Sequence, residues 1–451
     1  MFHKVLVANR GAVAARVLRA LYALGIKSIA IYSEADYGAP YLEMASETHA
    51  VGPAPARESY LNQERLIEVI RQSGADGVHP GYGFLSENAE FAQRVIDAGA
   101  RFIGPSPKWI DAMGHKTRAR ELAAQYGMPL SKGSAVLPVE PEAVLAAARA
   151  IGFPVLVKPA GGGGGIGMLP AKNEAELLSA VERSRSLASR GFGNAEVYLE
   201  RLIERPRHVE FQVLGDRHGA AAHLFERDCS TQRRNQKVIE EAPAPGIARV
   251  DIEGMAGKIA EIMRGMGYDN IGTVEMLYGA DGSFSFLEMN TRLQVEHGVT
   301  EAVTGVDLVQ AQIRSADGER LAAILPERIA IAGHAIQARV YAEDPKNFFP
   351  SPGRLKVFRL PEDPAIRVDT GYAEGRDVTP HYDPMIAKVI VRGATREQAI
   401  DRLIEALKAI DIQGIKHNIP AVISVLDSDA FRAGEVHTGI IQQVLTQKKA
   451  A

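Results

Sequence analysis

Residues 275–296 read EMLYGADGSFSFLEMNTRLQVE, and this stretch decides the fold of the central part of the chain. Apolar residues alternate with polar ones on both sides of Asp281-Gly282, a pair that favours a tight turn, so the pattern predicts a β-hairpin. Glu288 and Asn290 are two residues apart and share a face of their strand, and Glu275 is expected opposite them. Two carboxylates and an amide oxygen suit Mg²⁺ carrying nucleotide phosphates.

The alternation continues past the hairpin. Arg292, Gln294 and Glu296 would place a cation, an amide and a candidate base beside the predicted metal site, on the same strand. The alternative is a solvated hairpin with ordinary charges. The apolar residues between the polar groups favour a half-buried strand, and therefore a functional site.

Composition limits the class of protein. A length of 451 residues allows about three domains. The net charge of −3 without a long run of one sign argues against nucleic acid or an acidic membrane as partner. A strand predicted at residues 4–8 leaves no room for a signal peptide, and no apolar stretch is long enough to span a membrane. Cys229 is the only cysteine, which rules out an internal disulfide, so we expect a cytoplasmic protein.

Residues 1–115 alternate between short apolar strands and helices, which predicts a doubly wound parallel sheet. The strands are expected at 5–8, 29–32, 77–78 and 101–104, and the helices at 13–24, 65–72 and 89–98. The turn after the first strand contains only Gly11, so the GxGxxG pattern is missing and we exclude a nicotinamide site there.

Residues 130–203, which follow a helix predicted at 112–126, are expected to form a small α+β lid. A strand at 155–159 runs into five consecutive glycines, 161–165, and a helix at 174–188 and a strand at 196–200 complete the unit. The glycines are either a floppy hairpin tip or a flap whose N–H groups close over phosphates. Lys158, just before them, favours the flap. Residues 204–446 are strand-rich, with a mixed β subdomain from about 330.

The chain resembles the biotin carboxylase family of the ATP-grasp superfamily over essentially its whole length. The stretches that carry the resemblance are ANRG 8–11, HPGYGFLSEN 79–88, the five glycines, ERDCS 226–230, Gln236-Lys237, EMNTRLQVEH 288–297, AEDP 342–345 and HYDPM 381–385. The resemblance implies an ATP-grasp fold and ATP-dependent carboxylation of biotin carried on a protein. Bicarbonate attacks the γ-phosphate to give ADP and carboxyphosphate, which delivers CO₂ to a ureido nitrogen of biotin.

The resemblance also implies roles for individual residues. Lys116 and Lys158 neutralise the ATP phosphates under a flap that includes Gly163, Gly164 and Gly165. The remaining nucleotide contacts are Glu200, Arg201, Ile203, His208, Gln232 and Asn235. Mg²⁺ or Mn²⁺ is held by Glu275, Glu288 and Asn290. Bicarbonate is held by Lys237, Arg292, Gln294 and the Val295 N–H, with Glu296 as the base. Arg339 stabilises an enolate-like biotin oxygen, and biotin is bordered by Tyr82, Gly83 and Glu87.

Each role has an ordinary alternative. Lys116 could be a solvated charge on a helix, and Tyr82 could cap a loop. We interpret Cys229 as a small buried filler and not a nucleophile, because no sequence feature activates it.

The sequence departs from the family pattern at four positions outside the expected dimer contacts, and among those contacts Ala23 replaces a common acidic residue. Ala12 and Gln337 stand where the family usually has Glu, Ile166 where Arg or Lys is common, and Asn235 where it has His. None of these changes touches the predicted metal, bicarbonate or biotin groups, so we expect an active enzyme. A homodimer is expected through the region of Arg16 and Arg19.

The sequence after residue 420 has no biotin-attachment motif and no room for a carboxyltransferase. We therefore expect a stand-alone subunit that works with a separate biotin carboxyl carrier protein and a separate carboxyltransferase. Acetyl-CoA is the favoured final acceptor, with propionyl-CoA, other acyl-CoA esters and pyruvate open.

Two other functions remain as alternatives. Another ATP-grasp ligase would have no reason to keep residues 292–296 together with Arg339. An inactive nucleotide-binding regulatory subunit would bind ATP without bicarbonate-dependent hydrolysis.

Overall fold

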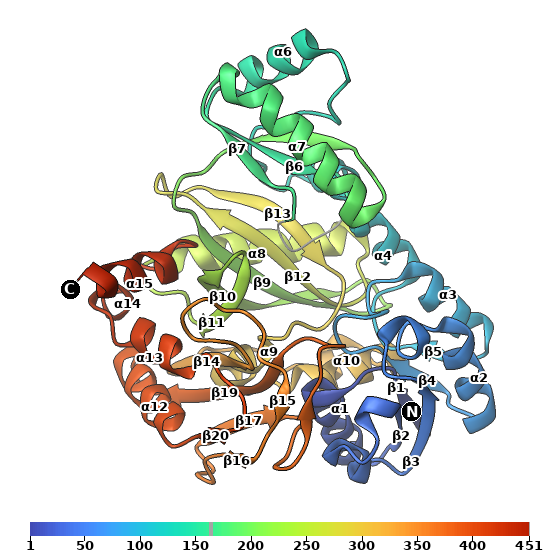
Figure 1. Cartoon of the computed structure of the whole chain (residues 1–451). Coiled ribbons are helices and arrows are strands. Elements are labelled where there is room, and N and C mark those ends of the chain that lie inside the picture. The colour runs from blue at the N-terminus through green and yellow to red at the C-terminus, as the bar shows by residue number, and fades with distance from the viewer. Residues whose placement is uncertain (162–165, 451) are drawn as a thin grey trace.

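The computed structural model describes residues 1–161 and 166–450. Three parts follow one another along the chain: an N-terminal part, a projecting lid and a large sheet with its helices (Figure 1). Within the described residues, no helix is both long enough and apolar enough to cross a bilayer.

The N-terminal part is a sheet in the order β3-β2-β1-β4-β5, and all its neighbouring strands are parallel, as predicted. Its central strands are short apolar runs because both faces of a parallel sheet are covered. Asn62 and Asn88 accept hydrogen bonds from N–H groups in the first turns of α2 and α3, which fixes where these helices begin. The elements are β1 Lys4–Val7, α1 Gly11–Ala23, β2 Lys27–Ser33, η1 Glu34–Asp36, η2 Pro40–Met44, β3 Glu47–Gly52, η3 Ala56–Glu58, α2 Gln63–Ser73, β4 Gly77–His79, α3 Ala89–Asp97 and β5 Arg101–Phe102.

The lid is an antiparallel sheet in the order β7-β6-β8 with two helices, and it projects at the top of Figure 1. Most of the predicted five-glycine flap, residues 162–165, lies outside the described residues. The helix predicted at 112–126 is two helices, because the backbone at His115 is extended (φ −113°, ψ 115°) and interrupts it. Helices α4 Pro107–Gly114 and α5 Lys116–Gln125 precede the lid, and the elements of the lid are α6 Pro141–Ile151, β6 Val155–Pro159, β7 Leu169–Ala171, α7 Glu174–Phe192 and β8 Val197–Arg201.

The third part is built on an eight-stranded antiparallel sheet in the order β13-β12-β9-β10-β11-β14-β19-β17. The subdomain predicted from about 330 therefore continues the same sheet, through the pairing of β11 with β14. The strands are β9 Arg207–Gly215, β10 Ala221–Arg233, β11 Gln236–Ala242, β12 Asn270–Tyr278, β13 Phe284–Asn290, β14 His334–Tyr341, β17 Ile366–Thr370 and β19 Met385–Gly393.

The helices of this part cover the large sheet, and short strand pairs lie beside it. Residues 353–359 are divided between β15 and β16, which pair with β18 and β20 in two separate small sheets. The elements are α8 Arg249–Met266, α9 His297–Thr304, α10 Leu308–Asp317, α11 Leu321–Ile324, β15 Gly353–Arg354, β16 Val357–Arg359, β18 Asp377–Val378, α12 Arg396–Lys408, β20 Asp411–Gln413, α13 Ile419–Leu426, α14 Asp429–Arg432 and α15 Ile440–Ala450.

The alternation along β9 decides which groups face the site. Val209, Phe211 and Val213 are buried in one apolar cluster with α8. The residues between them, including His208 and Glu210, must point to the other face of the sheet, because successive side chains of a strand alternate. One face of β9 is therefore core and the other carries buried polar groups.

Candidate active site

A cavity of about 800 Å³ lies where all three parts of the chain meet. The N-terminal part contributes residues 9–13 and 82–84, the lid contributes residues of β6 and β8, and strands of the large sheet and neighbouring loops contribute most of the rest. The predicted site residues that line it are Tyr82, Gly83, Lys116, Lys158, Glu200, Arg201, Ile203, His208, Gln232, Asn235, Lys237, Glu275, Glu288, Asn290, Arg292, Gln294, Val295, Glu296 and Arg339.

The other predicted site residues stand apart from this set. Glu87 does not line the cavity but accepts a hydrogen bond from Arg292 Nε at 2.8 Å. Gly163, Gly164 and Gly165 lie outside the described residues.

The hairpin of β12 and β13 has the predicted register. Glu275 lies opposite Glu288, and Thr273 lies opposite Asn290, so both carboxylates and the amide share one face. A bulge follows the Glu275–Glu288 pair, because Met276 lies opposite Phe286 and leaves Leu287 as an extra residue. The Asn290 side chain donates to Glu275 Oε1 at 2.8 Å.

The strand predicted to continue to Glu296 ends at Asn290. Residues 291–296 form a loop instead, and Glu296 directly precedes α9. Side-chain contacts organise this loop: Arg292 donates to Asn290 Oδ1 and to Gln294 Oε1, both at 2.9 Å. The predicted groups therefore come together, although by a loop and not by strand alternation.

Lys237 lies at the centre of the site. Its ammonium is 2.6 Å from a Glu210 oxygen and 2.7 Å from oxygens of Glu275 and Glu296. Burial by itself lowers the pKa of Lys237, but the three carboxylates outweigh burial and raise the pKa well above its ordinary value. Lys237 is therefore a fixed cation.

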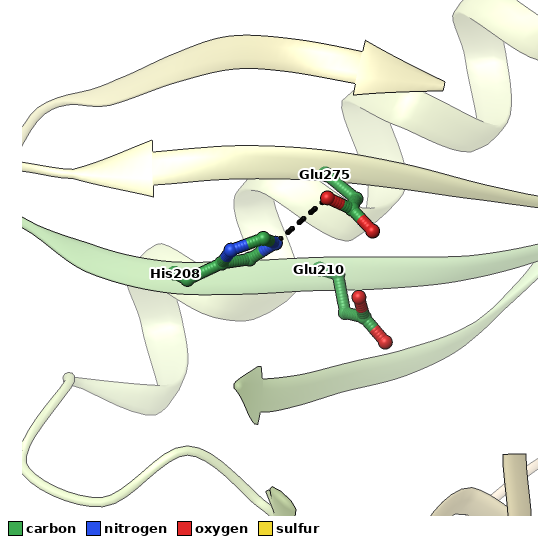
Figure 2. Close-up of side chains that lie close together, drawn as sticks. All are labelled: His208, Glu210 and Glu275. Atoms are coloured by element: carbon green, nitrogen blue, oxygen red, sulfur yellow. Dashed lines mark ion pairs between the residues drawn. The ribbon is translucent and has the colours of Figure 1, made fainter. Parts of the chain in front are cut away.

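His208, Glu210 and Glu275 point into one space from β9 and β12 (Figure 2). His208 Nε2 is 2.9 Å from Glu275 Oε2. Such a trio resembles a cation site, but the ammonium of Lys237 already contacts the carboxylates of Glu210 and Glu275. We therefore interpret it as part of an ion-pair cluster.

Glu296 connects this cluster to Arg339. One Glu296 oxygen contacts Lys237, and the other lies 3.0 Å from an Arg339 nitrogen. Burial favours a raised pKa for Glu296, but Lys237, Arg339 and Arg227 outweigh it and hold the pKa well below the usual value. Glu296 is therefore ionised. Arg339 is also paired, through Nε, with Glu240 at 2.5 Å.

The lid end of the cavity carries the two predicted phosphate lysines. Lys158 is buried on β6 and pairs with Glu200 on β8 at 2.9 Å. Burial lowers its pKa despite Glu200. Lys116 begins α5, and its ammonium lies 3.6 Å from Glu288. The Glu288 side chain is about one-third exposed and faces Glu275 across the hairpin, and carboxylate oxygens are ligands that a hard divalent cation prefers.

Glu210 and Glu240 are site residues that the sequence reasoning missed. Glu210 stands two residues after His208 on an alternating strand, a signal that could have identified it. No local pattern in the sequence indicated Glu240. Its contact with Arg339 depends on the pairing of β11 with β14, which places Glu240 opposite Gln337.

The structure also shows how Asn235 and Cys229 fit their surroundings. Asn235 has φ +63° in the turn between β10 and β11, a backbone conformation that asparagine tolerates. Cys229 is fully buried, and burial raises the pKa of its thiol, which fits a filler and not a nucleophile.

Comparisons with known proteins cover the whole site. Models of the biotin carboxylase N-terminal and C-terminal domains match residues 1–110 and 337–443. Between them, the model of the carbamoyl-phosphate synthase L chain ATP-binding domain matches residues 115–324.

Individual relatives match over nearly their full length. The biotin carboxylase of Halalkalibacterium halodurans is 47% identical, covering 99% of both chains. A pyruvate carboxylase subunit from Methanothermobacter thermautotrophicus is 45% identical, covering 98% of this chain and 90% of its own. A crystal structure of the biotin carboxylase domain dimer of Hydrogenobacter thermophilus 2-oxoglutarate carboxylase, in complex with MgADP, ADP and bicarbonate, is 42% identical with a TM-score of 0.94, covering 99% of both chains.

Fold, site geometry and relatives agree. The chain belongs to the biotin carboxylase family, whose members are ATP-dependent ligases.

Proposed function

We propose that this chain uses ATP and bicarbonate to carboxylate biotin carried on a separate protein, through carboxyphosphate. The observation that carries the proposal is that Lys237, Arg292 and Glu296 share one cavity with the paired carboxylates Glu275 and Glu288. An anion-binding cluster beside a metal-nucleotide site is what the attack of bicarbonate on a γ-phosphate requires.

Phosphoryl transfer depends mainly on positioning and charge neutralisation. We assign Lys116 and Lys158 to the ATP phosphates, and Glu275, Glu288 and Asn290 to Mg²⁺ or Mn²⁺. When bound, the cation neutralises charge that develops on the phosphates. Glu200, Arg201 and Ile203, with His208, Gln232 and Asn235, would hold the rest of the nucleotide, because they line the same cavity as Lys158.

The bicarbonate anion would lie between Lys237 and Arg292, with Gln294 and the Val295 N–H as further donors. Arginine offers a planar fork of donors that matches a small planar oxyanion. An anion placed there would offset the cations that now hold down the pKa of Glu296, and would make Glu296 a stronger base toward the bicarbonate proton.

Biotin would lie at the Arg339 side of the cavity. The Arg339 guanidinium could stabilise negative charge on the ureido oxygen as the nitrogen reacts. Tyr82 and Gly83 would form the wall next to it, and Glu87 would act through Arg292.

We also propose a homodimer, a separate carrier protein and a separate carboxyltransferase as partners. Acetyl-CoA as final acceptor stays a prediction, because relatives of similar identity belong to pyruvate and 2-oxoglutarate carboxylases. A cytoplasmic location stays a prediction as well.

The test is ADP release by the purified chain with Mg²⁺-ATP and free biotin, with and without bicarbonate. Turnover that needs both biotin and bicarbonate is expected. ATP binding without turnover, even with added carrier protein, would contradict the proposal and leave another ATP-grasp ligase and the regulatory subunit as the alternatives.

A further inference from the structure

Lys388 is a fully buried lysine just outside the active-site cavity. It lies on β19, directly between Arg339 on β14 and Asp369 on β17, so three charged side chains cross one face of the sheet in a row. Lys388 does not line the cavity. A fully buried ammonium costs free energy unless specific partners compensate it, so its contacts indicate its purpose.

The closest polar contact of the ammonium is a backbone group. Lys388 Nζ donates to the Val295 carbonyl oxygen at 2.9 Å, whereas the nearest Asp369 oxygen is 3.4 Å away. Asp369 also pairs with Arg19 at 2.5 Å and Arg367 at 2.9 Å, so it does not depend on Lys388 for a counter-ion. Burial lowers the pKa of Lys388 to about 8, while Asp369 opposes this effect. The lysine is thus mostly charged at neutral pH.

The Val295 carbonyl belongs to the loop 291–296, which carries Arg292, Gln294 and Glu296. This loop has no strand pairing, so its peptide groups need other partners. The Gln294 carbonyl accepts from His297 Nδ1 at 2.6 Å, which fixes the peptide plane that presents the Val295 N–H. The next peptide plane, between Val295 and Glu296, is fixed by Lys388.

We infer that Lys388 is a positioning residue: by holding the Val295 carbonyl it fixes the peptide that joins the anion-binding Val295 N–H to the base Glu296. This role rests on the proposed function. It predicts that loss of the Lys388 ammonium weakens the binding of bicarbonate but not of the nucleotide. The lysines assigned to the nucleotide phosphates, Lys116 and Lys158, lie away from Lys388, at the lid end of the cavity.

The test compares Lys388→Met with Val389→Ala. Lys388→Met keeps the approximate shape, removes the donor and leaves Asp369 paired with two arginines. Val389 is the next residue on β19, is fully buried and packs into the apolar cluster on the opposite side, so its truncation perturbs the same strand without touching Val295. Thermal stability and the KM values for bicarbonate and ATP are measured for each.

The expected result for Lys388→Met is a KM for bicarbonate raised about tenfold or more, since a charged donor is lost, with the KM for ATP within about twofold. Val389→Ala is expected to lower the melting temperature and leave both KM values unchanged. An unchanged KM for bicarbonate in folded Lys388→Met, or an equal rise for both substrates, would overturn the inference.

If Lys388→Met does not fold, Lys388→Arg replaces it, because arginine keeps the charge and an N–H donor. A KM for bicarbonate within about threefold of wild type supports the role, and a rise of about tenfold contradicts it. Turnover by the wild-type protein distinguishes failure of the inference about Lys388 from failure of the proposed function. If it shows no bicarbonate-dependent turnover, the proposed function fails and the role of Lys388 falls with it.

Discussion

Glu296 is the residue on which the proposed chemistry depends most directly. We expect Glu296→Gln to reduce bicarbonate-dependent ADP release by about a hundredfold or more, because general base catalysis contributes this much and an amide cannot take the proton. ATP affinity, measured by calorimetry with a non-hydrolysable analogue, should change little.

Glu253→Gln is the matched control for this prediction, because Glu253 is exposed on α8 and outside the cavity. It should leave turnover intact. Normal turnover by Glu296→Gln would remove Glu296 from the mechanism.

The contacts of Lys237 with buried carboxylates lead to a prediction about the pH dependence of stability. The pKa values of Glu275 and Glu296 are lowered in the folded protein, chiefly by Lys237, against the opposing effect of burial. Their contribution to stability is therefore fully present above the unfolded value of about 4.3 and is lost only as the pH falls through the lower folded values. These two groups should not make the wild-type melting temperature fall between about pH 8 and pH 5.5.

Lys237→Met should reverse this behaviour. Without the ammonium, the burial of Glu275 and Glu296 is compensated only by His208, Arg339 and Arg227, so the pKa values of both carboxylates rise and the fold is destabilised at neutral pH by about 3–5 kcal/mol. That cost shrinks as the pH falls and the carboxylates become protonated. Differential scanning fluorimetry should show a higher melting temperature for Lys237→Met at about pH 5.5 than at pH 8. Lys258→Met, at an exposed position, is the control, and a trend like that of wild type in Lys237→Met would contradict the argument.

The hairpin of β12 and β13 shows what sequence can predict at the level of elements. Its period of two and its Asp-Gly turn are local, so the pairing of Glu275 with Glu288 followed from the sequence. The same alternation continues through Arg292 and Glu296, yet the backbone leaves the sheet after Asn290. Long-range partners such as Glu87 and Lys388 hold the loop, and no local pattern encodes them.

The same hairpin contains the predicted metal ligands, so a change there should alter the Mg²⁺ requirement. Glu288→Gln should raise the Mg²⁺ concentration needed for half-maximal activity by about tenfold, because an amide oxygen carries no net charge for the cation. Titration of activity with Mg²⁺ at fixed ATP measures this. Asp281→Asn, an exposed carboxylate in the turn of the same hairpin, should leave the titration unchanged, and full activity of Glu288→Gln at low Mg²⁺ would exclude the role.

The turn between β10 and β11 shows that asparagine is compatible with position 235. Arg234 and Asn235 both have positive φ, 50° and 63°, as the two-residue turn requires. Asn235→Gly should therefore change the free energy of unfolding by less than about 0.5 kcal/mol, whereas Asn235→Val should lower it by about 1–2 kcal/mol. Urea unfolding of both variants measures the difference, and equal stabilities would contradict the assignment.

For the whole molecule we predict a homodimer in solution. Arg16, Arg19, Glu301 and Arg367 line an open surface hollow at which α1, α9 and β17 meet. This is the region where the sequence predicted contacts between protomers, and a related structure is a dimer. Sedimentation equilibrium should give twice the chain mass of 48.7 kDa, and a monomer at micromolar concentration would contradict the prediction.

The order of the three parts was predictable from the sequence, because each has its own local pattern. The parallel sheet follows from alternating strands and helices, and the lid from its strands around the glycines. The joining of residues before and after 330 into one sheet was not predictable, since β11 and β14 are far apart in the chain.

That shared sheet limits where the chain can be divided. The boundary between the matching ATP-binding and C-terminal models falls between residues 324 and 337, close to the start of β14. A gene cut at this place would leave β11 and β14 as two unpaired edges, each ready to aggregate. The C-terminal segment is therefore not an independent module, because its first strand completes a sheet that begins in the ATP-binding part.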